Sequence, residues 1–91
     1  MALPQLTPEQ RAEALASYAS FSRNLQLLKY EFSPKTRRQQ KVLSECRAAI
    51  KALKIELSKP LAWIDAARLN ALEEAARRAM IEYMRVCMNK E

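Results

Sequence analysis

Apolar residues recur along this chain at alternating intervals of three and four positions, and they do so in three separate stretches. The first runs through Tyr18, Phe21, Leu25, Leu28 and Phe32, the second through Leu43, Cys46, Ile50, Leu53 and Leu57, and the third through Leu69, Leu72, Ala76, Ala79 or Met80, Tyr83 and Cys87. This spacing places each set on one face of an α-helix, whereas a half-buried strand needs alternation with a period of two. The pattern therefore predicts three amphipathic helices and an all-α fold.

Capping signals with proline mark where the helices begin. The sequence Thr-Pro-Glu-Gln at 7–10 combines an N-cap threonine, a proline at the first helical position and a glutamine at the third, which together form a capping box. Ser33-Pro34 repeats the cap-then-proline signal, and 58–60 does so more loosely, with Asp65 as a second candidate start. We therefore expect helices at roughly 8–32, 34–58 and 61–89.

Three helices of similar length with short connections favour an antiparallel arrangement of neighbours. Each helix has one apolar face, and an up-down-up bundle is the simplest way to bury all three faces together. The length of 91 residues is typical of one domain. We therefore expect residues 1–91 to form a single antiparallel three-helix bundle.

The chain contains no glycine and no histidine, and these two absences exclude several functional classes. Without glycine there is no Gly-rich phosphate loop and no dinucleotide-binding fingerprint. Without histidine there is no Ser-His or Cys-His dyad and no His-bearing zinc site. Glu73 and Glu74 are adjacent and point about 100° apart on a helix, which is poor geometry for a catalytic carboxylate pair. We therefore expect a protein that is not an enzyme, without cofactor, metal or small-molecule substrate.

The two cysteines lie on apolar faces of the second and third helices. In an antiparallel pair, Cys46 and Cys87 would be about 20 Å apart along the bundle axis, beyond the reach of a disulfide. No base is placed to activate either thiol. We expect both to be buried, unpaired and poorly reactive.

The sequence has the pattern of neither a membrane-spanning helix nor an export signal. The longest uncharged stretch, 14–22, has nine residues and cannot span a bilayer. Residues 1–8 lack the basic start and the apolar core of a signal peptide. We therefore expect a cytoplasmic protein that does not associate with membranes.

The whole net charge of +6 is concentrated in the middle of the chain. Residues 34–59 carry eight basic and two acidic side chains, and the segments before and after are each balanced. A basic helix without matching acidic neighbours is the usual footprint of a phosphate-binding surface. The candidate nucleic-acid-binding residues are one row beside the apolar face, Arg47, Lys51 and Lys54, and an earlier cluster toward the other flank, Arg37, Arg38 and Lys41. The alternative is a solvated face that keeps a small protein soluble.

The last helix carries balanced charge. Its acidic and basic residues are spaced four apart, which favours ion pairs along one helix face. We expect a self-neutralising ladder of Glu73–Arg77, Glu74–Arg78 and Arg78–Glu82.

Several large apolar residues fall outside the three core faces. Such residues are common singly on protein surfaces, and they indicate an interface when they are contiguous; methionines also line adaptable binding surfaces. The candidate protein-interface residues are Leu27, Tyr30, Trp63, Ile81, Met84 and Met88. They would serve either a protein partner or self-association.

The first fifteen residues, MALPQLTPEQRAEAL, resemble the beginning of the actinobacterial integration host factors. These are small nucleoid proteins in which a leading helix packs on a DNA-binding helical domain. From residue 17 the chain departs from the Ala/Arg-rich helix of that family, and without glycine it lacks the family's DNA-binding turn. The resemblance implies a nucleic-acid partner and assigns no binding residue.

Two functions follow as hypotheses. The first is a small basic accessory subunit that contacts the phosphate backbone of DNA or RNA without sequence readout, within a larger nucleoprotein assembly. The alternative is a protein–protein interaction module, such as an adaptor or an inhibitor of a host complex, that acts through its apolar helix surfaces.

Overall fold

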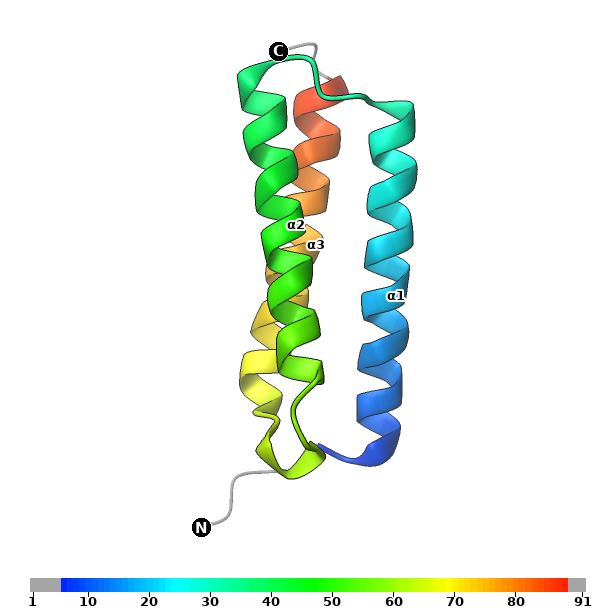
Figure 1. The fold of residues 1–91 in the computed structure, drawn as a ribbon, viewed down its shortest axis with the longest axis vertical. Helices are drawn as coiled ribbons and strands as arrows, with labels where there is room; N and C mark the ends of the chain where they lie inside the picture. Colours follow the sequence, from blue (N-terminus) through cyan, green and yellow to red (C-terminus); the bar gives the residue numbers. More distant parts are fainter. Residues whose placement is uncertain (1–5, 89–91) are drawn as a thin grey trace.

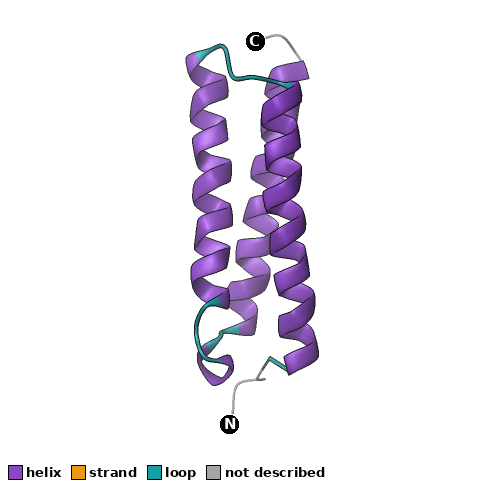
Figure 2. Cartoon of the chain, turned by 45° about the vertical axis from the view of Figure 1, so that its right-hand side comes forward, coloured by secondary structure: helices purple, strands orange, loops and turns teal. Residues whose placement is uncertain are grey.

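A computed structural model describes residues 6–88 as three long helices joined by short connections. The helices are α1 (Pro8–Glu31), α2 (Arg37–Leu57) and α3 (Ala66–Met88), and a 3-10 turn, η1 (Leu61–Trp63), precedes α3. α2 runs antiparallel to α1 and α3 (Figure 1), and no strand occurs within 6–88 (Figure 2). The all-α antiparallel three-helix bundle is therefore confirmed.

The first helix begins where the sequence predicts. The Thr7 hydroxyl accepts a hydrogen bond from the Gln10 N–H at 3.1 Å, and the Gln10 side-chain oxygen accepts one from the Thr7 N–H at 2.9 Å. This is the expected capping box, with Pro8 at the first helical position. The helix ends at Glu31, one residue before the predicted end.

The second helix begins three residues later than predicted. Thr36 is its N-cap, and its hydroxyl accepts a hydrogen bond from the Gln39 N–H at 3.1 Å. The buried side-chain oxygen of Gln39 accepts from the N–H groups of Lys35 and Thr36, at 2.7 and 3.3 Å. Ser33 and Pro34 remain in the connection, because the Thr36–Gln39 capping box satisfies backbone donors at the later position.

The third helix begins at Ala66, the second of the two predicted starts. One carboxylate oxygen of Asp65 accepts hydrogen bonds from the N–H groups of Ala67 and Arg68, at 2.9 and 3.2 Å. The start at 61 was wrong, since residues 61–63 form the 3-10 turn. The predicted end at residue 89 lies outside the described residues.

The core is formed mainly by α2 and α3, which pack more extensively on each other than either packs on α1. One cluster consists of Leu25, Val42, Leu43, Cys46, Ile50, Ala76, Met80, Tyr83 and Val86. A second, toward the α2–α3 connection, consists of Leu6, Ala14, Leu53, Leu57, Ile64 and Leu69. Ala14 and Leu25 are the buried residues of α1, and most of its predicted apolar face is only half-buried.

Two buried polar contacts join separate elements, and the sequence gives no signal for either. The Tyr83 side chain is fully buried, and its hydroxyl donates a hydrogen bond to the Phe32 carbonyl. The buried Glu56 carboxylate pairs with Lys59 at 3.0 Å and with Arg68 at 3.2 Å, and it accepts a hydrogen bond from the Asp65 N–H. The first contact joins α3 to the end of α1, and the second joins the end of α2 to the start of α3.

Candidate functional site

Partial burial of α1 leaves a groove on each side of it. The groove between α1 and α2 encloses about 620 Å³, and the groove between α1 and α3 about 380 Å³. We call the first the basic groove; its lining consists of Tyr18, Ser22, Leu25, Gln26, Lys29, Arg47, Ile50, Lys51, Lys54, Ile55 and Ser58. We call the second the apolar groove; its lining consists of Phe21, Asn24, Leu27, Leu28, Glu31, Arg77, Met80, Ile81 and Met84.

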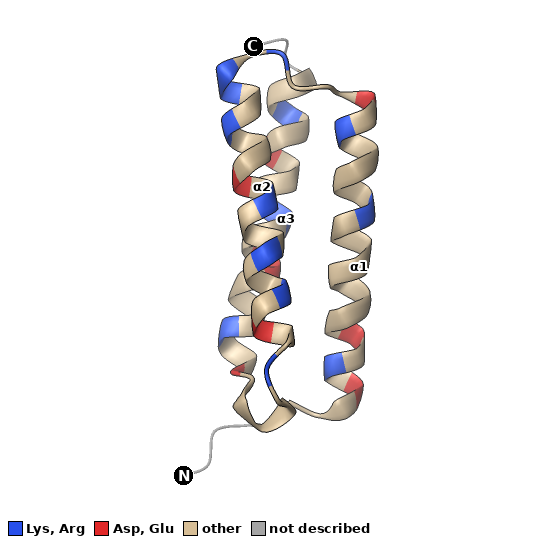
Figure 3. Ribbon diagram, in the orientation of Figure 1, with Lys and Arg blue, Asp and Glu red and all other residues tan. Residues whose placement is uncertain are grey.

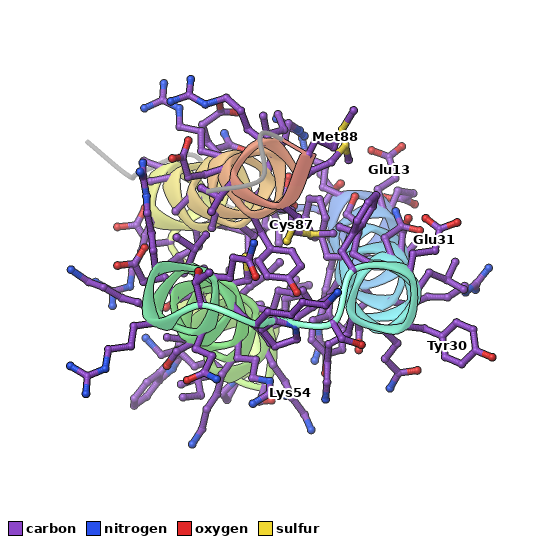
Figure 4. The ribbon with its side chains drawn as sticks, turned by 90° about the horizontal axis from the view of Figure 1, so that it is seen from above. Glu13, Tyr30, Glu31, Lys54, Cys87 and Met88 are labelled. Carbon is purple, nitrogen blue, oxygen red and sulfur yellow. The ribbon has the colours of Figure 1, made fainter. Side chains whose placement is uncertain are left out.

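The basic groove contains the whole predicted row of cations. Arg47, Lys51 and Lys54 project from α2, and Lys29 adds a fourth cation from α1. Lysine and arginine positions recur along the length of α2 (Figure 3), and Lys54 extends from α2 on the side away from α3 (Figure 4). Among the described residues, none of these four cations forms an ion pair. Their positive charge is therefore available to an external anion.

The floor of the basic groove is apolar. Leu25 and Ile50 are buried, Tyr18 is half-buried and Ile55 is exposed. Sequence reasoning missed Lys29 and Ile55 as members of this site. The spacing on α2 alone could not reveal Lys29, because its place depends on how α1 and α2 align.

The second predicted cluster, Arg37, Arg38 and Lys41, lies in the first turns of α2 and does not line the basic groove. Arg38 is 4.0 Å from Glu82 on α3, a carboxylate that also pairs with Arg85 at 3.6 Å. This end of α2 is therefore partly neutralised by α3. The structure separates the six predicted cations into two surfaces.

The ion pairs of α3 differ from the predicted ladder. Glu74 pairs with both Arg77, at 2.6 Å, and Arg78, at 3.2 Å. Glu73 turns toward α1, where it lines a smaller hollow, and burial raises the pKa of its carboxyl against the opposing charge of Arg77. The predicted Glu74–Arg78 pair is therefore confirmed. Within the described part of the chain, Glu73 and Arg77 attract each other without a direct ion pair, and Glu82 pairs with Arg38 and Arg85 in place of the predicted Arg78.

The apolar groove unites half of the predicted protein-interface residues. Leu27, Ile81 and Met84 line it together. Tyr30 is 89% exposed and points away from the bundle (Figure 4), and Trp63 is 75% exposed in η1. Met88 is exposed at the last described position of α3. The six residues are therefore not one continuous surface.

Both cysteines are free thiols. Cys46 is fully buried, and burial together with the Glu45 charge raises its pKa to about 11. Cys87 is only half-buried, which corrects the expectation that both thiols are buried. Burial, with a hydrogen bond to Cys87, raises the pKa of Tyr83 to about 12.

Within residues 6–88, no cluster of three acidic or cysteine side chains has the geometry to hold a metal ion. No helix in this part of the chain is both long and apolar enough to cross a bilayer.

Comparison with protein-family models, with curated proteins and with solved structures found no match for this chain, so the resemblance of its first fifteen residues to integration host factors gains no support from them.

Proposed function

We propose that this protein binds the phosphate backbone of nucleic acid through the basic groove, as a small accessory subunit of a nucleoprotein assembly. The observation that carries the proposal is the set of four cations, Lys29, Arg47, Lys51 and Lys54, that line one groove without an ion pair among the described residues. Uncompensated lysine and arginine side chains bind phosphates and release the counterions condensed on them.

The spacing of the α2 cations suits a phosphate chain. From Arg47 to Lys54 the helix rises ~10 Å, at ~1.5 Å per residue. Successive phosphates of one strand of B-form DNA rise by ~3.4 Å along the duplex axis, so the row spans about three of them. Contacts to phosphates carry no sequence information, so we expect binding that tolerates any base sequence.

The test compares two double variants of α2 that remove the same charge. Lys51→Gln/Lys54→Gln removes two cations of the basic groove, whereas Arg37→Gln/Lys41→Gln removes two exposed cations outside it. We expect the first variant to weaken binding to a DNA duplex and to an RNA strand by on the order of tenfold or more near 0.1 M salt. We expect the second to weaken it by less than about threefold, through long-range attraction alone.

Circular dichroism of both variants controls for folding, and fluorescence anisotropy of labelled DNA and RNA measures the affinity. Equal losses in the two variants would show that binding follows total charge rather than the basic groove. Affinity unchanged in both variants would contradict binding through the cations of α2, and no binding by wild type would contradict a nucleic-acid partner.

The second candidate function is a protein–protein interaction module, an adaptor or an inhibitor of a host complex. The observation that favours it is the apolar groove, where Leu27, Ile81 and Met84 present adjacent apolar side chains. Ionic strength separates the two functions, because phosphate binding weakens steeply with salt and an apolar interface responds little.

A further inference from the structure

The four cations of the basic groove lie beside apolar surface. Leu25 and Ile50 are buried at its floor and belong to the core, and Tyr18 is half-buried. Ile55 is 56% exposed and belongs to neither core cluster. Phosphates alone gain nothing from apolar surface, because only apolar groups are driven out of water onto it. The floor therefore indicates a ligand that has apolar surface as well as negative charge.

The rest of the groove lining suits the polar edges of such a ligand. Among the described residues that line the groove, none is acidic. Ser22 and Gln26 line it from α1, and their hydroxyl and amide groups can both donate and accept hydrogen bonds. The edges of nucleic-acid bases carry donors and acceptors of the same uncharged kind. The groove thus combines groups for phosphates, for the faces of bases and for the edges of bases.

We propose that the basic groove takes an unpaired strand of DNA or RNA, with its phosphates at the four cations and its bases on the apolar floor. This inference rests on the proposed nucleic-acid function and specifies the ligand of the same site. The bases of an unpaired strand have faces free to lie on aromatic and apolar side chains. In a duplex the bases are stacked on one another and present only their edges. A duplex can therefore contact the cations but not the floor.

The length of the groove suits a short stretch of strand. Its lining extends from Tyr18 to Lys29 on α1 and from Arg47 to Ser58 on α2, which is ~16 Å along either helix at ~1.5 Å per residue. Successive nucleotides of a stacked strand rise by ~3.4 Å, so about five of them cover this length. Protein modules that bind single strands in a cationic groove have sites of ~4–16 nucleotides.

Fluorescence anisotropy with four labelled ligands of equal length tests the preference. They are a thymidine strand, a uridine strand, a DNA strand that lacks bases, and the thymidine strand paired with its complement, all long enough for the duplex to stay paired. Counterion release alone favours the duplex, which carries one charge per ~1.7 Å of axis against one per ~3.4 Å for a single strand. We expect the opposite order. Near 0.1 M salt the thymidine and uridine strands should bind at least about tenfold more tightly than the strand without bases, and about threefold more tightly than the duplex.

Ile55→Gln removes exposed apolar surface from the floor and leaves every cation in place. It should weaken binding of the thymidine strand at least about threefold, because less apolar area is buried, and change duplex affinity by less than about twofold. Ile81→Gln is the matched control, because Ile81 is 57% exposed but lies on α3 outside the basic groove. It should leave both affinities unchanged.

Tyr18→Leu keeps an apolar side chain but removes the aromatic ring of the floor. It should weaken binding of the thymidine strand at least about fivefold, through the loss of stacking with one base. Tyr18 also packs against both core clusters, so circular dichroism must show that this variant is folded. Methyl resonances of wild type give a readout that needs no variant. Those of Ile55 should shift on addition of the thymidine strand and stay in place with the duplex, and those of Ile81 should stay in place with both.

Three results would overturn the proposal and leave phosphate binding by the basic groove intact. The first is equal affinity for the strands with and without bases, and the second is a duplex that binds more tightly than the thymidine strand. The third is binding of the thymidine strand without a shift of the Ile55 methyl resonances and without a loss of affinity in Ile55→Gln. Failure of all four ligands to bind would instead contradict the proposed function itself.

Discussion

Glu56 joins the end of α2 to the start of α3 through ion pairs and a hydrogen bond. In the sequence it is one of two acidic residues in a basic segment. In the structure its carboxylate is buried among Lys59, Arg68 and the Asp65 N–H. Burial opposes its ionisation, yet the hydrogen bonds and the two cations outweigh burial and lower its pKa below the ordinary 4.5. The charge of Glu56 therefore stabilises the fold at neutral pH.

Glu56→Gln should lower the free energy of unfolding at pH 7 by about 1–2 kcal/mol, since it removes a charged acceptor but both cations keep access to water. Because folding lowers this pKa, the contribution is complete above about pH 4.5 and disappears as the pH falls through the folded-state value. The difference between wild type and variant should therefore shrink on acidification. Urea unfolding at several pH values measures it.

Glu74→Gln is the matched control. It also removes a carboxylate that pairs with two cations, but on an exposed face, so it should cost less than about 1 kcal/mol. An equal cost for both variants, or a difference for Glu56→Gln that does not change with pH, would contradict the assigned role of Glu56.

At the scale of the elements, the sequence predicts correctly the features that depend on signals within one helix. It does not predict the features that depend on how separate helices align with one another. The three apolar periods and the capping box at Thr7 are local, and they predicted the helices and the start of α1. The start of α2 is also encoded locally, as Thr36 followed three residues later by Gln39, a capping box that the prediction from Ser33-Pro34 missed. Lys29 in the basic groove depends on the alignment of separate helices, which no spacing within one helix encodes.

The two competing starts of α2 give a direct test. Thr36→Ala removes the hydroxyl that accepts from the Gln39 N–H, and it should destabilise the protein by about 1 kcal/mol. Ser33→Ala changes a residue in the connection and should have an effect within about 0.5 kcal/mol. Thermal unfolding of the two variants measures the difference, and a larger loss for Ser33→Ala would contradict the observed cap.

At the scale of the whole molecule, the helices differ in how far ion pairs neutralise their charges. Two of the carboxylates of α3, Glu74 and Glu82, are paired with arginines of the same helix, and Glu82 also pairs with Arg38 of α2. The cations of the basic groove have no such partners among the described residues. The excess of basic residues in the middle segment is evident from the sequence, whereas the packing of the helices determines which face of the molecule exposes these residues. We infer that this face is where a polyanion docks.

The salt dependence of nucleic-acid binding tests this central claim most directly. Wild type and Arg47→Glu/Lys51→Glu/Lys54→Glu are titrated against a DNA duplex over a range of ionic strength, with circular dichroism to verify folding. If the row makes three phosphate contacts, the log–log slope of the binding constant against salt should be shallower in the variant by about 2–3 units, with much weaker binding at low salt. A folded variant that binds with the affinity and the slope of wild type would contradict the claim.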